Sequence, residues 1–258
     1  MRPELLYNPR LLCERLAEIS LQRRRLAKLR GTAAQYLLSG HIDSLELLEL
    51  LRPISPKVIY DVGANVGTWT LLGKAIFPHA VVHSFEPLRR HHSAFTENVR
   101  NSNSVYLHKV ALGESSGNAT MRVANFSDSS SILPLSAAGK KEWHLEEVAQ
   151  ESVTVLRMDD YRCSAQLPFP GLVKLDVQGF ELAVLRGASE CLGQANAVLA
   201  EVSFQEFYQG QCLFHELVAF LSLHGFFIYA LGHGTAIDRP ILQTDVLFLK
   251  GKIPTLPQ

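Results

Sequence analysis

Residues 59–67 read Ile-Tyr-Asp-Val-Gly-Ala-Asn-Val-Gly, an apolar run that gives way to Asp61 and then to Gly63, Asn65 and Gly67 at two-residue spacing. Glycines at the end of a strand permit backbone angles and close approach that a Cβ would forbid. The N–H groups of the helix that follows such a strand point into the crevice at its carboxyl end. We therefore expect a nucleoside ligand to lie directly on this turn.

Glu86 is the second residue with ligand-binding chemistry, at the end of the run Val-Val-His-Ser-Phe-Glu. A carboxylate about 20 residues after such a turn accepts hydrogen bonds from both hydroxyls of a ribose. The turn lacks the Gly-x-Gly-x-x-Gly pattern of a dinucleotide site, and its Asp61 is a poor neighbour for a pyrophosphate. An acid suits a ligand that carries an ammonium group, and S-adenosylmethionine has an amino-acid tail and a cationic sulfonium.

Asp176 and Glu201 are candidate catalytic carboxylates, each at the end of a predicted strand. Asp176 could place an acceptor or take its proton, or it could cap the helix that starts after Gly179. Because neighbouring strands lie about 4.8 Å apart, the two carboxylates could meet at one acceptor hydroxyl or hold a divalent cation, although we do not expect a cation. His215 and His233 follow later strands, where a base could reach the acceptor.

The elements that position these residues alternate between short β-branched runs and helical stretches, which is typical of a βαβ architecture. From residue 117 to 157, two extended pieces and a polar loop with Ser129–Ser131 interrupt this alternation and indicate an insertion over the carboxyl edge of the sheet. The predicted strands are 57–61, 81–85, 105–110, 172–176, 197–202, 226–229 and 245–249, and the predicted helices are 68–77, 90–100, 180–188 and 213–223.

The first part of the chain has a different pattern, with leucines and isoleucines at helical spacing up to Pro53 and Pro56. We therefore divide the chain into an N-terminal helical extension, residues 1–55, and a domain formed by residues 56–258. The basic cluster Arg23–Arg25 is interpreted as a solvated helix face.

Composition excludes several classes of protein. Lys plus Arg and Asp plus Glu each number 25 among 258 residues, so the zero formal net charge gives no indication of a nucleic-acid partner. No apolar run approaches the roughly 20 residues that span a bilayer, and the N-terminus has no signal pattern. The four cysteines are far apart in the sequence, as is usual for reduced thiols. We expect a soluble, cytoplasmic protein.

Six segments, in this order, resemble the FkbM family of S-adenosylmethionine-dependent methyltransferases. They are DVGANVG from Asp61, FEP from Phe85, VALGE from Val110, SSS from Ser129, KLDVQGFELAVLRGA from Lys174 and LAEV from Leu199. One position departs from the family pattern, because Gln178 stands where an acid is common. The resemblance covers residues 58–250 and leaves the N-terminal helices outside it.

The resemblance implies an α/β fold of the Rossmann-like class I methyltransferase type. This is a doubly wound, seven-stranded, mostly parallel sheet whose last strand is antiparallel. It also implies an O-methyltransferase that acts on a hydroxyl of a sugar, glycan or secondary metabolite. The cofactor contacts expected from it are Asp61, Gly63, Asn65, Gly67, Glu86, Pro87, Ala111, Leu112, Ser130 and Asp176.

Two other functions are compatible with the same crevice. A nicotinamide-dependent oxidoreductase would use it for a dinucleotide, but the third glycine of that pattern is missing. A non-catalytic scaffold would keep the fold and use the N-terminal helices to dock a partner or to form a homo-oligomer. It would have no physical need for Asp61, Glu86 and Asp176 together.

Overall fold

The structure of the protein is a computed structural model that describes residues 13, 20, 23–35, 42–126, 128–232 and 241–251. Most of the expected first helix and the candidate base His233 lie outside these residues. Among the described helices, none has the length and apolar character needed to cross a membrane.

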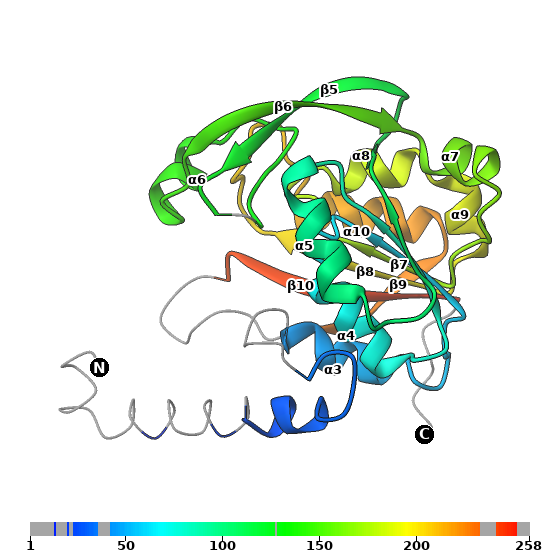
Figure 1. The fold of residues 1–258 in the computed structure, drawn as a ribbon. Helices are drawn as coiled ribbons and strands as arrows, with labels where there is room; N and C mark the ends of the chain where they lie inside the picture. Colours follow the sequence, from blue (N-terminus) through cyan, green and yellow to red (C-terminus); the bar gives the residue numbers. More distant parts are fainter. Residues whose placement is uncertain are drawn as a thin grey trace, which may run out of the picture.

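A seven-stranded sheet forms the centre of the molecule, in the order β3-β2-β1-β7-β8-β10-β9 (Figure 1). β10 pairs antiparallel with β8 and β9, and the other pairs are parallel. The chain order reverses between β1 and β7, which is where doubly wound sheets open a crevice for a ligand. The strands are β1 (Val58–Val62), β2 (Val81–Phe85), β3 (Val105–His108), β7 (Leu172–Leu175), β8 (Ala197–Ser203), β9 (Phe226–Leu231) and β10 (Gln243–Lys250).

Helices cover both faces of this sheet because successive strand residues point to opposite sides. One face packs against α3 (Ile42–Leu50) and α4 (Thr68–Ile76) through Ile59, Leu172 and Leu247. The opposite face packs against a second group of helices through Tyr60, Val173 and Val246. This group comprises α7 (Met158–Ser164), α8 (Glu181–Arg186), α9 (Ser189–Gln194) and α10 (Phe214–Leu223), whereas α5 (Arg89–Val99) lies beside α4.

The predicted insertion forms a second, three-stranded sheet in the order β4-β6-β5. β5 (Gly117–Ala124) and β6 (Glu147–Leu156) are long and antiparallel, and they arch over α5 and α8 at the top of Figure 1. The short β4 (Ala111–Leu112) joins them, and α6 (Ala137–Glu142) lies in the connection between β5 and β6. The polar loop after β5 reaches the loop that follows β7, where Ser131 Oγ donates a 2.7 Å hydrogen bond to the backbone oxygen of Gln178.

The predicted fold class is confirmed, including the antiparallel last strand. The main differences concern element ends: the third strand stops at His108, because the chain turns there toward β4. The predicted helix 180–188 is shorter and is followed by α9.

The N-terminal extension contributes to the core of the domain. Leu45, Leu48 and Leu51 are fully buried, in the same cluster as residues of β1, β7 and β10. Arg25, interpreted above as solvated, is instead buried, and its guanidinium lies 2.7 Å from the Glu46 carboxylate on α3. In its packing, α3 is therefore part of the sheet domain even though it precedes residue 55.

This packing predicts a contrast between two leucines of α3. Leu48→Ala removes a fully buried side chain and is expected to lower the free energy of unfolding by about 2–5 kcal/mol. Leu50→Ala, at a position that is 43% exposed, is expected to change it by less than about 0.5 kcal/mol. Urea denaturation of both variants measures the difference, and equal effects would show that α3 is not part of the core.

Candidate active site

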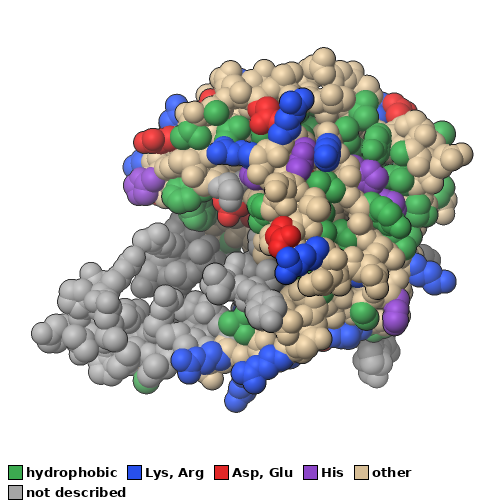
Figure 2. Space-filling view, viewed as in Figure 1, with side chains coloured by type: hydrophobic (Ala, Val, Ile, Leu, Met, Phe, Trp, Pro, Cys, Tyr) green, Lys and Arg blue, Asp and Glu red, His purple; other side chains and the backbone are tan. Residues whose placement is uncertain are grey.

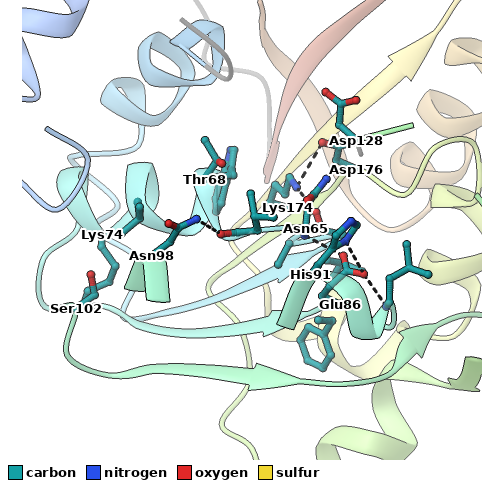
Figure 3. A pocket seen from close by; sticks show the side chains of 18 of the residues that line it. Asn65, Thr68, Lys74, Glu86, His91, Asn98, Ser102, Asp128, Lys174 and Asp176 are labelled. Carbon is teal, nitrogen blue, oxygen red and sulfur yellow. Dashed lines mark hydrogen bonds and ion pairs between the residues drawn. The ribbon is translucent and has the colours of Figure 1, made fainter. Parts of the chain in front are cut away.

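A cavity of about 1200 Å³ opens at the carboxyl ends of β1, β2 and β7 (Figure 3). It continues along the groove between α4 and α5, where Lys74, Asn98 and Ser102 line it. Figure 2 shows basic, acidic and histidine side chains interspersed over the upper part of one face of the molecule, with Lys and Arg side chains along its lower edge.

The glycine turn after β1 forms one wall of this cavity. Gly63 has φ +81°, and a Cβ there would lie 1.8 Å from the backbone oxygen of Asp176. Only glycine allows the ends of β1 and β7 to approach so closely. Gly67, also with positive φ, is the N-cap of α4, and because no side chain caps this helix, its first N–H groups have no side-chain acceptor. This helix terminus can bind an anionic group.

Glu86 lines the cavity at the end of β2 and is only 5% exposed. Its two carboxylate oxygens accept hydrogen bonds from Asn65 N at 2.9 Å and from Leu88 N at 2.7 Å. His91 Nδ1 lies 3.3 Å from the same carboxylate. These contacts fix the carboxylate beside the glycine turn, as the spacing in the sequence predicts.

The lining of the cavity also includes apolar residues that follow β2 or belong to the second sheet, and we call this part of the lining the apolar slot. Pro87, Ala111 and Leu112, which were expected to contact a cofactor, all line it. Such a slot suits a flat, weakly polar ring. Its other apolar walls are Leu88, Val110, Met121, Ile132 and Phe180.

Lys174 is a buried cation in the floor of the cavity. Its ammonium lies 3.2 Å from Asp61 Oδ1 and 3.6 Å from Asp176 Oδ2, and it donates a 3.1 Å hydrogen bond to Gly63 O. Burial by itself lowers the pKa of Lys174, but the Asp61 and Asp176 carboxylates outweigh it, and the net effect raises the pKa. Asp61 also accepts a 2.6 Å hydrogen bond from Thr70 of α4.

The side-chain amide of Gln178 lies between the two candidate catalytic carboxylates. Its Nε2 is 2.8 Å from Asp176 Oδ1 and 3.1 Å from Glu201 Oε2. Glu201 also accepts a 3.3 Å hydrogen bond from Gln243 of β10. Burial and the nearby Asp176 and Asp245 carboxylates raise the pKa of Glu201 well above its usual value.

Glu181, on the first turn of α8, holds the loop that follows Asp176. Its Oε1 accepts hydrogen bonds from Val177 N at 3.0 Å and Gly179 N at 3.1 Å. Burial raises the pKa of Glu181 to about 7, although these backbone hydrogen bonds favour the charged form. Glu181 therefore stabilises the turn and titrates in an unusual range for a carboxylate.

Most expected contact residues lie together in the lining: Gly63, Asn65, Glu86, Pro87, Ala111, Leu112, Ser130 and Asp176. Asp61 and Gly67 do not form part of it. Asp61 is completely buried and contacts Lys174 and Thr70, and Gly67 packs against Phe95, whose ring would lie 3.0 Å from an added Cβ. In this structure Asp61 and Gly67 therefore support the site through their contacts with neighbouring residues and do not line the cavity.

Two of the predicted catalytic residues, Glu201 and His215, lie outside the lining of the cavity. Glu201 does not line the cavity, because Gln178 lies between its carboxylate and Asp176. His215 is exposed on the first turn of α10, because this helix buries Leu217 and Leu221 and so turns His215 toward solvent. His215 lies outside the lining of the cavity, and its role as a catalytic base stays a prediction from the sequence.

Other residues of the site were missed in the sequence. Lys174 had a detectable signal, since a lysine inside the apolar run Leu-Val-Lys-Leu is rarely buried without a partner. Asp128, which lines the cavity from the polar loop, had none. Within the described part of the chain, no group of three His, Cys, Asp or Glu side chains could hold a metal ion.

The Lys174 network predicts strong coupling between two variants. Lys174→Met leaves Asp61 buried without its cation and is expected to lower the free energy of unfolding by about 3–5 kcal/mol. Adding Asp61→Asn removes the buried charge, so the double variant should lose at least about 1 kcal/mol less than the sum of the single variants. Chemical denaturation of all three measures this coupling; additive losses would contradict the ion pair.

Glu181 predicts a pH dependence of stability. Because its pKa is raised from 4.5 to about 7 in the folded protein, the folded state keeps a proton that the unfolded state has already released. The stability of the wild type relative to Glu181→Gln should therefore fall as the pH rises from about 4.5 to about 7. Denaturation of both proteins across this range measures the difference; a constant difference would contradict the raised pKa.

Comparison with known proteins gives a consistent family. The profile of the family described as "Methyltransferase FkbM domain" matches residues 61–228. Hexuronic acid methyltransferase AglP of Haloferax volcanii is 30% identical over 166 residues, which span 64% of this chain. The alignment spans 63% of AglP, so this chain covers less than two thirds of that protein's length.

Two further proteins are similar to this chain. 31-O-demethyl-FK506 methyltransferase FkbM of Streptomyces tacrolimicus is 28% identical over 203 residues, which span 70% of this chain and 75% of that protein. The solved magnesium protoporphyrin IX methyltransferase of Synechocystis PCC 6803 has a TM-score of 0.46 and 12% identity, over 81% of each chain. Because the matched segment spans more than half of the sequence and contains Asp61, Glu86, Lys174 and Asp176, the chain belongs to the FkbM methyltransferase domain family.

Proposed function

We propose that this protein transfers the methyl group of S-adenosylmethionine to a hydroxyl oxygen of a sugar, glycan or secondary metabolite. The observation that carries the proposal is the position of Asp176. It lies at the carboxyl end of β7, lines the cavity and is backed by the buried Lys174. The family assignment supports the methyltransferase part of the proposal.

The residues of the cavity fit this methyl donor. Glu86 is a carboxylate within the lining, and each of its oxygens has acceptor capacity beyond its one backbone hydrogen bond, so it can bind ribose hydroxyls. The apolar slot with Ala111 and Leu112 suits an adenine ring, and the uncapped start of α4 suits a carboxylate of the amino-acid tail. When bound, S-adenosylmethionine supplies a methyl group on a cationic sulfur, which leaves as a neutral thioether.

Asp176 has the chemistry needed to activate an acceptor hydroxyl. An ionised carboxylate offers about four lone-pair sites. One faces Gln178 Nε2 at 2.8 Å and another faces Lys174 Nζ at 3.6 Å, which leaves acceptor capacity for the hydroxyl. Asp176 would thus orient the oxygen and take its proton as the methyl group is transferred.

The nature of the acceptor is inferred from chemistry and from relatives. One relative is named for a hexuronic acid and another for 31-O-demethyl-FK506, so both names refer to oxygen-bearing acceptors. In this chain, Asp128 and Ser130 line the cavity from the polar loop near Asp176. A carboxylate and a hydroxyl are suitable partners for several hydroxyls of one acceptor.

A ligand titration tests the proposed function. Thermal unfolding is followed with S-adenosylhomocysteine, NAD and ATP in parallel, since a ligand that binds only the native state stabilises it by about 2.7 kcal/mol at 100 times its dissociation constant. We expect stabilisation by S-adenosylhomocysteine alone. Stabilisation by NAD alone would favour the oxidoreductase, and no response would contradict a nucleoside site. Radiolabelled S-adenosylmethionine with hexuronic acids, neutral hexoses and macrolides then identifies the acceptor.

The role of Asp176 predicts a separation of binding from turnover. Asp176→Asn keeps the shape of the side chain but removes the base, so methyl transfer should fall by about 10²–10⁴-fold. Binding of S-adenosylhomocysteine should stay within about tenfold of the wild type, as measured by isothermal titration calorimetry. Asp160→Asn, at a position whose side chain is 63% exposed, is the control and should keep full turnover. Unchanged turnover of Asp176→Asn would exclude Asp176 as the base.

A further inference from the structure

Gln178 has a backbone and side chain that are fixed from several directions. It follows β7 with φ +54°, a left-handed conformation that is uncommon for a residue with a side chain. Its backbone oxygen accepts the 2.7 Å hydrogen bond from Ser131 of the polar loop. The insertion therefore holds this residue in place at the edge of the cavity, which Gln178 also lines.

The orientation of the Gln178 amide follows from its partners. Tyr208 Oη lies 3.0 Å from Gln178 Oε1 and 2.8 Å from Ser129 O, so its hydroxyl can donate to either. Burial and the Glu201 carboxylate raise the pKa of Tyr208, so its hydroxyl keeps this hydrogen. A reversed amide would direct its oxygen at the Asp176 carboxylate, which pairs with Lys174 and is not a donor when ionised. Glu201 can accept a hydrogen bond in either protonation state. The two N–H groups must therefore face these carboxylates.

Asp176 and Glu201 each have a carboxylate oxygen within 3.1 Å of one nitrogen atom. Two carboxylates beside one atom repel each other unless a proton, a cation or hydrogen-bond donors lie between them. Here the Gln178 Nε2 occupies that place, 2.8 Å from one carboxylate and 3.1 Å from the other. A primary amide has two hydrogens, one for each partner. The Gln178 amide thus lies where a cation that bridges two carboxylates would lie, but the amide is neutral.

We propose that Gln178 is the positioning residue of the site, in which its amide takes the place of a bridging divalent cation and holds Asp176 toward the acceptor. The proposal rests on the proposed function and adds the way in which its base is oriented. Glu201, which does not line the cavity, then acts as the anchor on the far side of the amide. Tyr208 keeps the amide in its orientation.

Binding of Mn²⁺, followed by the electron paramagnetic resonance signal of the free ion, tests this role without an acceptor. Gln178→Glu places a third carboxylate between Asp176 and Glu201, and should bind Mn²⁺ at least about tenfold more tightly than the wild type. Gln178→Ala opens the gap without adding an acid, and should bind it more tightly than the wild type but less tightly than Gln178→Glu. Gln243→Glu is the matched control: it also adds an acid beside Glu201, but the Gln243 amide donates to Glu201 and Ser203 rather than to Asp176.

The outcomes separate this proposal from the proposed function. Equal Mn²⁺ affinity of wild type and Gln178→Ala, or of Gln178→Glu and Gln243→Glu, would overturn the bridging role of Gln178. The same proteins are titrated with S-adenosylhomocysteine. If the wild type binds it and the Mn²⁺ pattern is absent, only the role of Gln178 fails. If the wild type does not bind it, the proposed function fails, whatever Mn²⁺ does.

Discussion

The buried ammonium of Lys174 is the interaction on which the rest of the site depends. It links the carboxylates of Asp61 on β1 and Asp176 after β7, and it also bonds the backbone oxygen of Gly63. A buried charge is tolerated only when it is paired. The Lys174 ammonium therefore holds the end of β1, the glycine turn and the end of β7 in one arrangement. The absence of a Cβ at Gly63 permits that arrangement, because the backbone of Asp176 occupies the space that a Cβ would need.

From this ion network the site extends in two directions. Toward β2, the glycine turn donates to Glu86, and the apolar slot follows. Toward β8, Asp176 is bonded to Gln178, which in turn reaches Glu201. Residues two apart on a strand point to the same face of the sheet. The charged residues Asp61, Lys174, Glu201 and Asp245 therefore lie on the same face as their apolar neighbours Ile59, Leu172, Leu199 and Leu247. The polar end of the site thus continues the hydrophobic core that α3 and α4 cover.

Much of this arrangement could be predicted from the sequence. The positions of most strands, and of Asp61, Glu86 and Asp176 at strand ends, follow from local patterns, because hydrophobic periodicity and glycine spacing act over a few residues. The antiparallel last strand was expected only from the family resemblance. The packing of α3 could not be predicted, since nothing local shows that Leu48 shares a core cluster with residues of β1 and β10. The direction of the His215 side chain could not be predicted, because it depends on which face of α10 is buried.

The electrostatic details were harder to predict because they depend on contacts between distant segments. Asp61 suggested a partner for a ligand's ammonium group, but an internal ammonium, Lys174, lies beside it. Gln178 could be read only as a departure from a family pattern, and its role depends on Tyr208 and Glu201, which follow it by 30 and 23 residues. No local pattern encodes such a network.

A crystal structure of the protein with S-adenosylhomocysteine is the decisive measurement for this site. We expect the ribose hydroxyls on the Glu86 carboxylate, the adenine beside Ala111 and Leu112, and the thioether sulfur facing Asp176. We also expect Lys174 to stay paired with Asp61 and Asp176. A ligand bound elsewhere in the groove, or a Lys174 that leaves both carboxylates to contact it, would contradict this arrangement.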